Sequence, residues 1–107
     1  VRRPDLALLY DPSRPVERLL ATAWAEALAS ALPDRAVRRN NPYRGAADGM
    51  TTAFRRLFSG QRYLGLEIEV NQRHVGSDGS FPPWVGAALL ATLPDALLTI
   101  PRGRALP

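Results

Sequence analysis

Apolar and polar positions along the first third of the chain follow two different periods. Residues 5–11, DLALLYD, form a short continuous apolar run, which predicts a buried strand of a parallel or mixed sheet. Residues 13–33 instead place apolar side chains at steps of three and four, the pattern of one face of an amphipathic helix. We expect Ser13 to cap this helix, Pro15 to lie in its first turn and Pro33 to end it.

The middle of the chain predicts a short strand, a polar bend and a second helix. Residues 35–40 suit an edge strand, and the polar residues 40–45, NNPYRG, suit a tight bend. Residues 48–60 predict a helix of about two turns, which Asp48 or Thr51 could cap. We expect the apolar side chains of this helix to point inward: Met50, Phe54, Leu57 and Phe58.

The last third contains the clearest strand pattern. Residues 62–72, RYLGLEIEVNQ, alternate strictly, which predicts a strand with two different faces. One face carries Leu64, Leu66, Ile68 and Val70, and the other carries Gly65, Glu67 and Glu69. After a loop rich in glycine, serine and proline, residues 84–100 are apolar at helical spacing, with Pro94 expected to break or kink this helix.

Strands and helices therefore alternate along the chain. This order predicts an α/β fold, with a layered mixed sheet flanked by helices. No linker, internal repeat or low-complexity tract interrupts the sequence, so we expect residues 1–107 to form a single unit.

Composition narrows the possible classes of protein. All 14 basic residues are arginine, which together with the many alanines, leucines and prolines is typical of a GC-rich bacterial genome, so the net charge of +4 carries little weight. The absence of cysteine excludes disulfides and thiolate metal sites, and it fits a reducing, cytoplasmic location. No apolar run reaches the roughly 18 residues of a membrane span, and no secretory signal, phosphate loop or dinucleotide motif is present.

Two carboxylates on one face of the last predicted strand have two interpretations. Glu67 and Glu69 could lie on a solvated sheet face, which is the more common situation. However, Glu69 ends the strand and the polar residues 71–74 follow it, and α/β sheets bind ligands beyond the carboxyl ends of their strands.

Two motifs in this order resemble a known family. NNPYRGAADGMTT, followed about twenty residues later by YLGLEIEVNQ, is similar to the C-terminal half of the N-formylglutamate amidohydrolases. That family consists of zinc hydrolases related in fold to the carboxypeptidases. The resemblance implies a phosphorylase/hydrolase-like fold, of which this chain would be the C-terminal portion, and hydrolysis of an N-acyl amino acid such as N-formylglutamate.

The resemblance also implies roles for individual residues. Glu69 matches the general base that acts on zinc-bound water, and Glu67 matches a supporting position. The polar bend matches a substrate-binding wall that includes Asn41, Tyr43 and Arg44. Because some family members place an arginine after the Thr-Thr pair instead, either Arg44 or Arg55 could bind the substrate carboxylate.

The metal site is where this chain departs from the family. A catalytic zinc takes three protein ligands, whereas the only histidine is His74, which we expect to be exposed or hydrogen-bonded. The family's ligands match no residue here and would lie upstream of Val1. The chain is therefore either part of a longer hydrolase, which its non-methionine start favours, or a relative that has lost the activity. The alternative from another class is an arginine-rich nucleic-acid-binding module; the hydrolase interpretation predicts no nucleic-acid or membrane partner.

Overall fold

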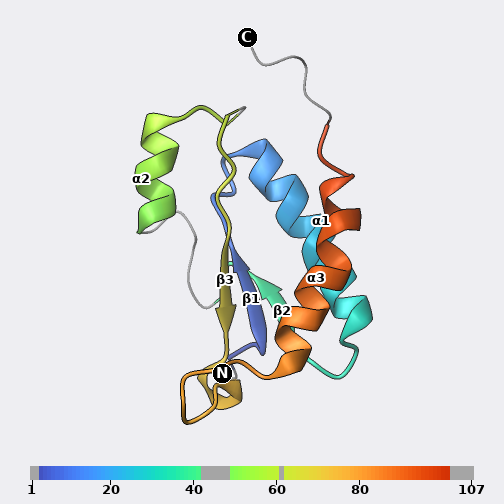
Figure 1. Cartoon of the computed structure of the whole chain (residues 1–107). Helices are drawn as coiled ribbons and strands as arrows, with labels where there is room; N and C mark the ends of the chain where they lie inside the picture. The colour runs from blue at the N-terminus through green and yellow to red at the C-terminus, as the bar shows by residue number, and fades with distance from the viewer. Residues whose placement is uncertain (1–2, 42–48, 61, 102–107) are drawn as a thin grey trace.

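The computed structural model of the chain describes residues 3–41, 49–60 and 62–101. These residues form a small α/β domain in which a three-stranded mixed sheet packs with α-helices (Figure 1). The elements follow the predicted order of strand, helix, strand, helix, strand and helix. Their bounds are β1 Leu6–Leu9, α1 Pro15–Ala31, β2 Val37–Arg39, α2 Met50–Leu57, β3 Glu67–Val70, the 3-10 turn η1 Gln72–His74, and α3 Pro83–Leu97.

β1 lies at the centre of the sheet, whose strand order is β2-β1-β3. It pairs in parallel with β2 and antiparallel with β3. All four residues of β1 are buried, which explains why its sequence is a continuous apolar run and confirms the predicted mixed sheet.

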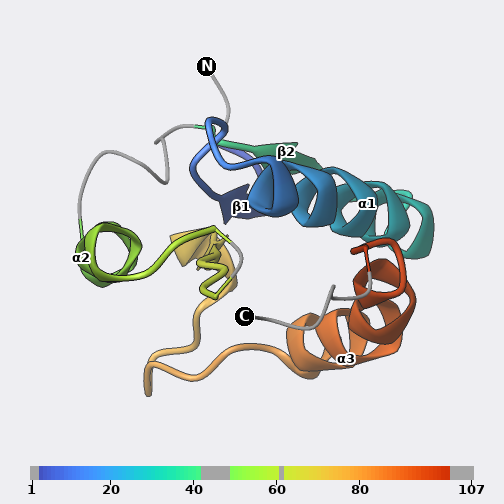
Figure 2. The ribbon, with the colours of Figure 1, turned by 90° about the horizontal axis from the view of Figure 1, so that it is seen from above.

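The hydrophobic core lies on one face of this sheet. Figures 1 and 2 show α1 and α3 together on that side, whereas α2 lies on the other side of β3. The indole nitrogen of Trp24 on α1 donates to the Thr92 hydroxyl on α3 at 2.8 Å, so even the polar groups between the two helices are paired. The strand predicted over residues 62–72 is shorter in the structure, where β3 is Glu67–Val70. Most of the predicted apolar face still packs against this core, through Leu64 and Leu66 before the strand and Val70 on it, whereas Ile68 is 40% exposed.

Helix ends differ in detail from the sequence prediction. Pro15 occupies the first turn of α1 as expected, but the cap position is Arg14, and no side chain caps the helix. Ser13 donates its hydroxyl to Asp11 at 2.6 Å instead, so its predicted capping role is wrong. Pro94 does not break α3, which continues through it to Leu97.

The orientation of α2 is the largest difference from the prediction. Met50 and Leu57 were expected to point inward, but they are 74% and 72% exposed. Phe54 and Phe58 are also exposed, and their rings pack with each other and with the ring of Tyr63. Arg55 is the buried residue of α2, because its guanidinium pairs with a buried carboxylate of α1.

The start of α2 also differs from the expected capping. The cap position is Gly49, with φ of 98°, and the Thr51 hydroxyl bonds to Glu67 of β3 rather than to the helix end. Asp48, the other predicted cap, lies outside the described residues. None of the helices in the described segments is both long and apolar enough to cross a membrane.

Candidate functional site

Glu67 and Glu69 project from the face of the sheet that is turned away from α1 and α3. Successive side chains of a strand alternate between faces, and the core-facing neighbour Val70 fixes which face is which. On this second face Glu69 lies opposite Ala7 of β1, and Glu67 lies opposite Leu9. The sheet thus places the two carboxylates side by side, as the alternation predicted.

The direction of β3 corrects one step of the sequence argument. Glu69 was expected at the carboxyl edge of the sheet, where α/β proteins bind ligands. Because β3 runs antiparallel to β1, Glu69 instead lies level with the middle of β1, and Glu67 lies level with its carboxyl end at Leu9. The position of Glu69 at a strand end therefore gives no support of its own to a catalytic role.

A different feature distinguishes Glu69 from the other acidic residues. Among the described residues, five carboxylates are buried or half-buried, and four of them accept hydrogen bonds: Asp5, Asp11, Glu17 and Glu67. The carboxylate of Glu69 is half-buried, yet it makes no hydrogen bond or ion pair with any described residue. It is the one partly enclosed carboxylate of the described segments with its acceptor sites unused.

Glu67 has a structural partner. Its Oε1 accepts a hydrogen bond of 2.9 Å from the Thr51 hydroxyl, and this bond joins β3 to the first turn of α2. The supporting role that the resemblance implied for Glu67 agrees with this contact.

Arg55, one of the two candidate carboxylate binders, is buried and paired. Its Nε donates to both carboxylate oxygens of Glu17 at 3.0 and 2.9 Å, and its Nη2 donates to the Gly65 carbonyl at 2.9 Å. Burial acts to lower the pKa of Arg55, but the bonds and charge of Glu17 outweigh it and raise the pKa above its ordinary value. The guanidinium therefore anchors α2 to α1.

Arg14 makes further contacts that hold the end of α2 against the start of α1. Its guanidinium donates to the backbone carbonyls of Arg55 and Phe58 at the end of α2, and to that of Tyr63. A cation at a helix C-terminus also stabilises the helix dipole. Sequence reasoning missed both contacts, since residues 14 and 17 lie about forty positions before their partners.

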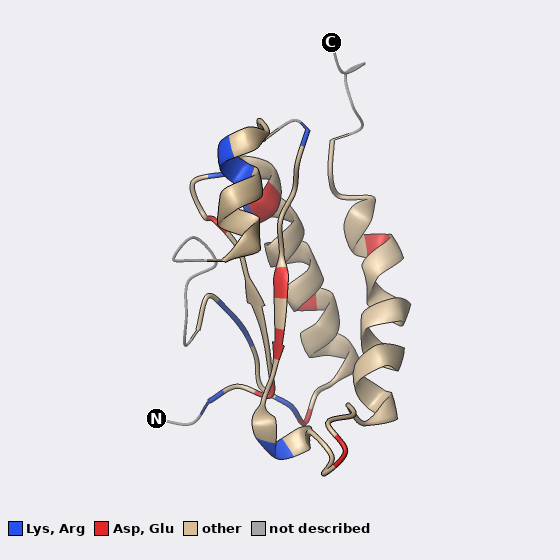
Figure 3. Ribbon diagram, turned by 60° about the vertical axis from the view of Figure 1, so that its left-hand side comes forward, with Lys and Arg blue, Asp and Glu red and all other residues tan. Residues whose placement is uncertain are grey.

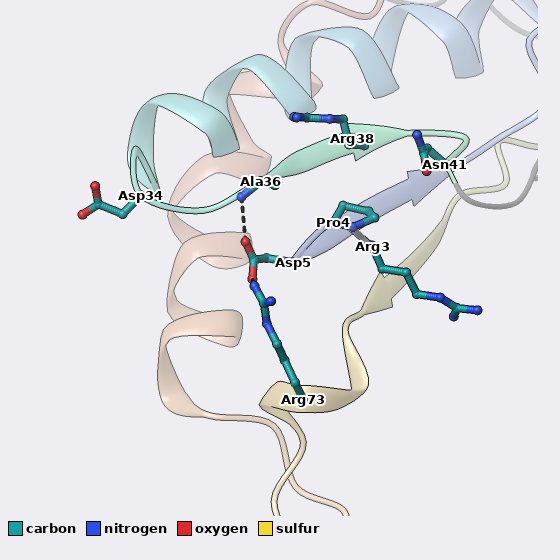
Figure 4. Close-up of a pocket in the computed structure, with 8 residues that line it drawn as sticks. All are labelled: Arg3, Pro4, Asp5, Asp34, Ala36, Arg38, Asn41 and Arg73. Atoms are coloured by element: carbon teal, nitrogen blue, oxygen red, sulfur yellow. Dashed lines mark hydrogen bonds and ion pairs between the residues drawn. The ribbon is translucent and has the colours of Figure 1, made fainter. Parts of the chain in front are cut away.

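The other predicted substrate-binding residues are only partly described. Asn41 is exposed and lines a pocket of about 270 Å³ together with Arg3, Asp5, Arg38 and Arg73 (Figure 4). Tyr43 and Arg44 lie outside the described residues.

Asp5 organises a polar cluster that the sequence did not reveal. Its carboxylate accepts bonds from the Ala36 backbone N–H at 2.7 Å and from the Arg73 guanidinium (Figure 4). It also bonds His74 Nε2 at 2.6 Å. Burial acts to raise the pKa of Asp5, but the bonds from His74, Ala36 and Arg73 outweigh burial and hold the pKa well below its usual range. The only sequence signal was an acidic residue at the start of a buried strand.

His74 belongs to this cluster, as its predicted hydrogen-bonded role suggests. Its ring also packs edge-on against Trp84 of α3, with ring centroids 5.2 Å apart. No group of three histidine, cysteine, aspartate or glutamate side chains in the described ranges could hold a metal ion. These residues therefore do not fit a zinc cage.

Basic residues are spread over several elements of the described chain. Figure 3 shows them on α2, on β2 and near η1, with acidic residues on other parts of the ribbon. Several are engaged in internal contacts, including Arg14, Arg39, Arg55 and Arg73. No protein family, curated protein or solved structure was found to match the chain.

Proposed function

We propose that this chain forms the base-bearing, C-terminal part of a zinc-dependent hydrolase that cleaves the amide bond of N-acyl amino acids such as N-formylglutamate. Glu69 would accept the proton of the attacking water. The observation that carries the proposal is the half-buried Glu69 carboxylate, which has no partner among the described residues. It also stands at the position that the family resemblance gives to the general base.

The chemistry requires such a group. A general base has to be ionised, partly shielded from water and free to accept a proton. The other buried or half-buried acids of the described segments are already bonded, as Glu17 is to Arg55 and Asp5 is to Arg73. Glu69 is therefore the carboxylate best suited to this role.

Substrate recognition is assigned to the polar bend. A substrate carboxylate is bound well by the planar fork of an arginine. Because Arg55 is committed to Glu17, this proposal gives the role to Arg44, together with Asn41 and Tyr43 of the same polar bend. Arg55 then contributes indirectly, by holding α2 in place.

Zinc, as the family resemblance implies, would supply an activated water and positive charge for the developing oxyanion. The described residues do not provide its ligands, so the proposal requires them from outside this sequence, in a longer polypeptide. The chain's own contribution is the acceptance of a proton at the Glu69 carboxylate.

Hydrolysis of N-formyl-L-glutamate by the purified protein, with and without a chelator, tests the reaction. We expect the chelator to abolish turnover. Glu69→Gln should lower kcat by about 10²–10⁴-fold with KM within about twofold, because proton transfer is lost and binding is retained. Glu67→Gln is the matched control, since its amide oxygen can still accept from Thr51.

Two results would reject this function. The first is an absence of hydrolysis with every N-acyl amino acid tested at full metal loading. The second is a Glu69→Gln variant as active as Glu67→Gln. A salt-sensitive affinity for DNA, measured by titration, would instead support the nucleic-acid alternative.

A further inference from the structure

The outer edge of β3 has no strand paired to it among the described residues. The strand order places β3 at one side of the sheet, with β1 as its neighbour. The backbone N–H of Asn71 donates to the carbonyl of Asp5, and hydrogen-bonded pairs alternate along an antiparallel ladder. The backbone groups of Glu67 and Glu69 therefore face β1, and those of Ile68 and Val70 face outward.

An apolar groove runs along the same edge. It has a volume of about 420 Å³ and lies between β3 and the first half of α3. Two large apolar side chains of this groove are open to solvent, since Ile68 is 40% exposed and Phe81 is 59% exposed. The groove is lined by Ile68, Val70, Phe81, Pro82, Val85 and Leu89.

These two features match the requirements of one kind of ligand. An extended peptide that adds to a sheet edge gains backbone hydrogen bonds, and its alternate side chains enter pockets on one face. At β3 the residues opposite Ile68 and Val70 would point toward the groove. The residue between them would point to the second face, beside Glu67 and Glu69.

We propose that the edge of β3 binds an extended polypeptide segment with two apolar residues separated by one basic residue. The apolar side chains occupy the groove, and the basic side chain lies beside the two carboxylates. Cross-strand pairs of opposite charge stabilise a sheet, whereas like charges opposite each other destabilise it.

Charge also argues against a second copy of this chain as the occupant. Two β3 edges paired around a twofold axis would bring Glu67 and Glu69 of both copies onto one face. Four carboxylates would then lie within neighbouring cross-strand positions, which is unfavourable. The inference does not depend on the proposed hydrolysis.

The probe is a blocked hexapeptide that alternates valine and arginine, labelled for fluorescence anisotropy. Three comparison peptides test charge, residue order and backbone hydrogen bonding separately. The first has glutamate in place of arginine, the second has the same composition with the valines and arginines grouped, and the third is N-methylated at the valines. We expect each to bind at least tenfold more weakly. The chain's own net charge of +4 opposes non-specific attraction of a basic peptide.

Gly86 allows the groove to be blocked without unfolding the protein. It lies in α3, it lines the groove, and a Cβ added there meets open space. Gly86→Leu should therefore fill the groove while favouring the helix, since glycine costs about 1 kcal/mol in a helix interior. Ala87→Leu, at an exposed neighbouring position outside the groove lining, is the matched control.

We expect Gly86→Leu to weaken binding at least tenfold and Ala87→Leu to leave it unchanged. Amide hydrogen exchange of Ile68 and Val70 should slow when the basic peptide binds. Equal affinity for the basic and acidic peptides, or binding that survives Gly86→Leu, would overturn the proposal. So would a dimer in sedimentation that Gly86→Leu dissociates, because it would identify a second copy as the occupant. None of these measurements depends on hydrolysis, so they fail or succeed separately from the proposed reaction.

Discussion

Replacement of Arg55 by methionine separates an anchoring role from a substrate-binding role. The change keeps much of the side-chain volume but removes the guanidinium that donates to both Glu17 oxygens. Glu17 is 1% exposed, so its charge would remain buried, and among the described residues only the backbone N–H groups of Asp11 and Gly65 would still donate to it. Removal of one partner from a buried ion pair costs about 3–5 kcal/mol, and we expect a loss of that size.

A second substitution tests the physical reason for this loss. Arg55→Met combined with Glu17→Gln removes the buried charge. Because the Asp11 and Gly65 N–H groups bond different oxygens of Glu17, the single amide oxygen can still accept from only one of them. We expect the double variant to lie about 1–3 kcal/mol below wild type, the cost of polar groups that have lost a partner. It should therefore be more stable than the single variant.

Urea denaturation followed by circular dichroism at neutral pH measures these differences, with Arg56→Met as the exposed control. A domain of this size has a total stability of about 5–15 kcal/mol, so the loss remains measurable. If Arg55→Met were as stable as Arg56→Met and raised KM for an N-acyl amino acid, the anchoring role would be refuted and the substrate-binding role supported.

Three further predictions test separate contacts. The pKa of Asp5 is lower in the folded chain than in the unfolded chain, so its ionised form stabilises the fold above the unfolded pKa of about 4. This contribution is lost as the pH falls through the folded pKa. Asp5→Asn should therefore make acid unfolding between about pH 5 and 2 less steep, with the exposed Asp34→Asn as control. Asn40 has φ of 48° and accepts from the Tyr10 N–H at 3.0 Å, so in thermal melts Asn40→Ala should be about 1 kcal/mol less stable than Asn40→Gly, which avoids the backbone strain. Leu57→Gln should change the stability by less than about 0.5 kcal/mol in the urea assay, because Leu57 is 72% exposed; a loss of several kcal/mol would contradict its position.

The elements that could be predicted are those in which the buried face of a strand or helix sets the spacing of apolar residues. The continuous apolar run of β1 fits a central strand buried on both faces, and the spacing of α1 matches the helix that covers the core. The alternation at residues 64–70 separated the apolar side chains that pack against the core, Leu64, Leu66 and Val70, from Glu67 and Glu69, although only residues 67–70 form the strand. In each case the burial of one local face is enough to determine the pattern.

The features that the sequence did not predict depend on contacts between distant residues. Periodicity identifies the apolar side of α2 but not the side that faces the domain, and the Arg55–Glu17 pair, 38 residues apart, turns the polar side inward. Similarly, Asp5 bonds to His74, which lies 69 residues away in the sequence, and the local sequence around neither residue predicts this contact. Alternation is also the same for either direction of a strand, which is why the antiparallel course of β3 was not foreseen.

The antiparallel course of β3 connects the proposed reaction with the proposed peptide site. On one side Glu69 has Ala7 of β1, whose methyl group offers it no hydrogen bond. On the other side is the edge at which no described strand pairs, so a segment that binds there would become a further neighbour of the carboxylate. A strand at this edge would therefore enclose Glu69 further and set the charge beside it. Suppose that Gly86→Leu abolishes peptide binding and also changes the pH profile of hydrolysis, while Ala87→Leu changes neither. The peptide site and the reaction would then be coupled through the Glu69 carboxylate. An unchanged pH profile would show that Glu69 works independently of the edge.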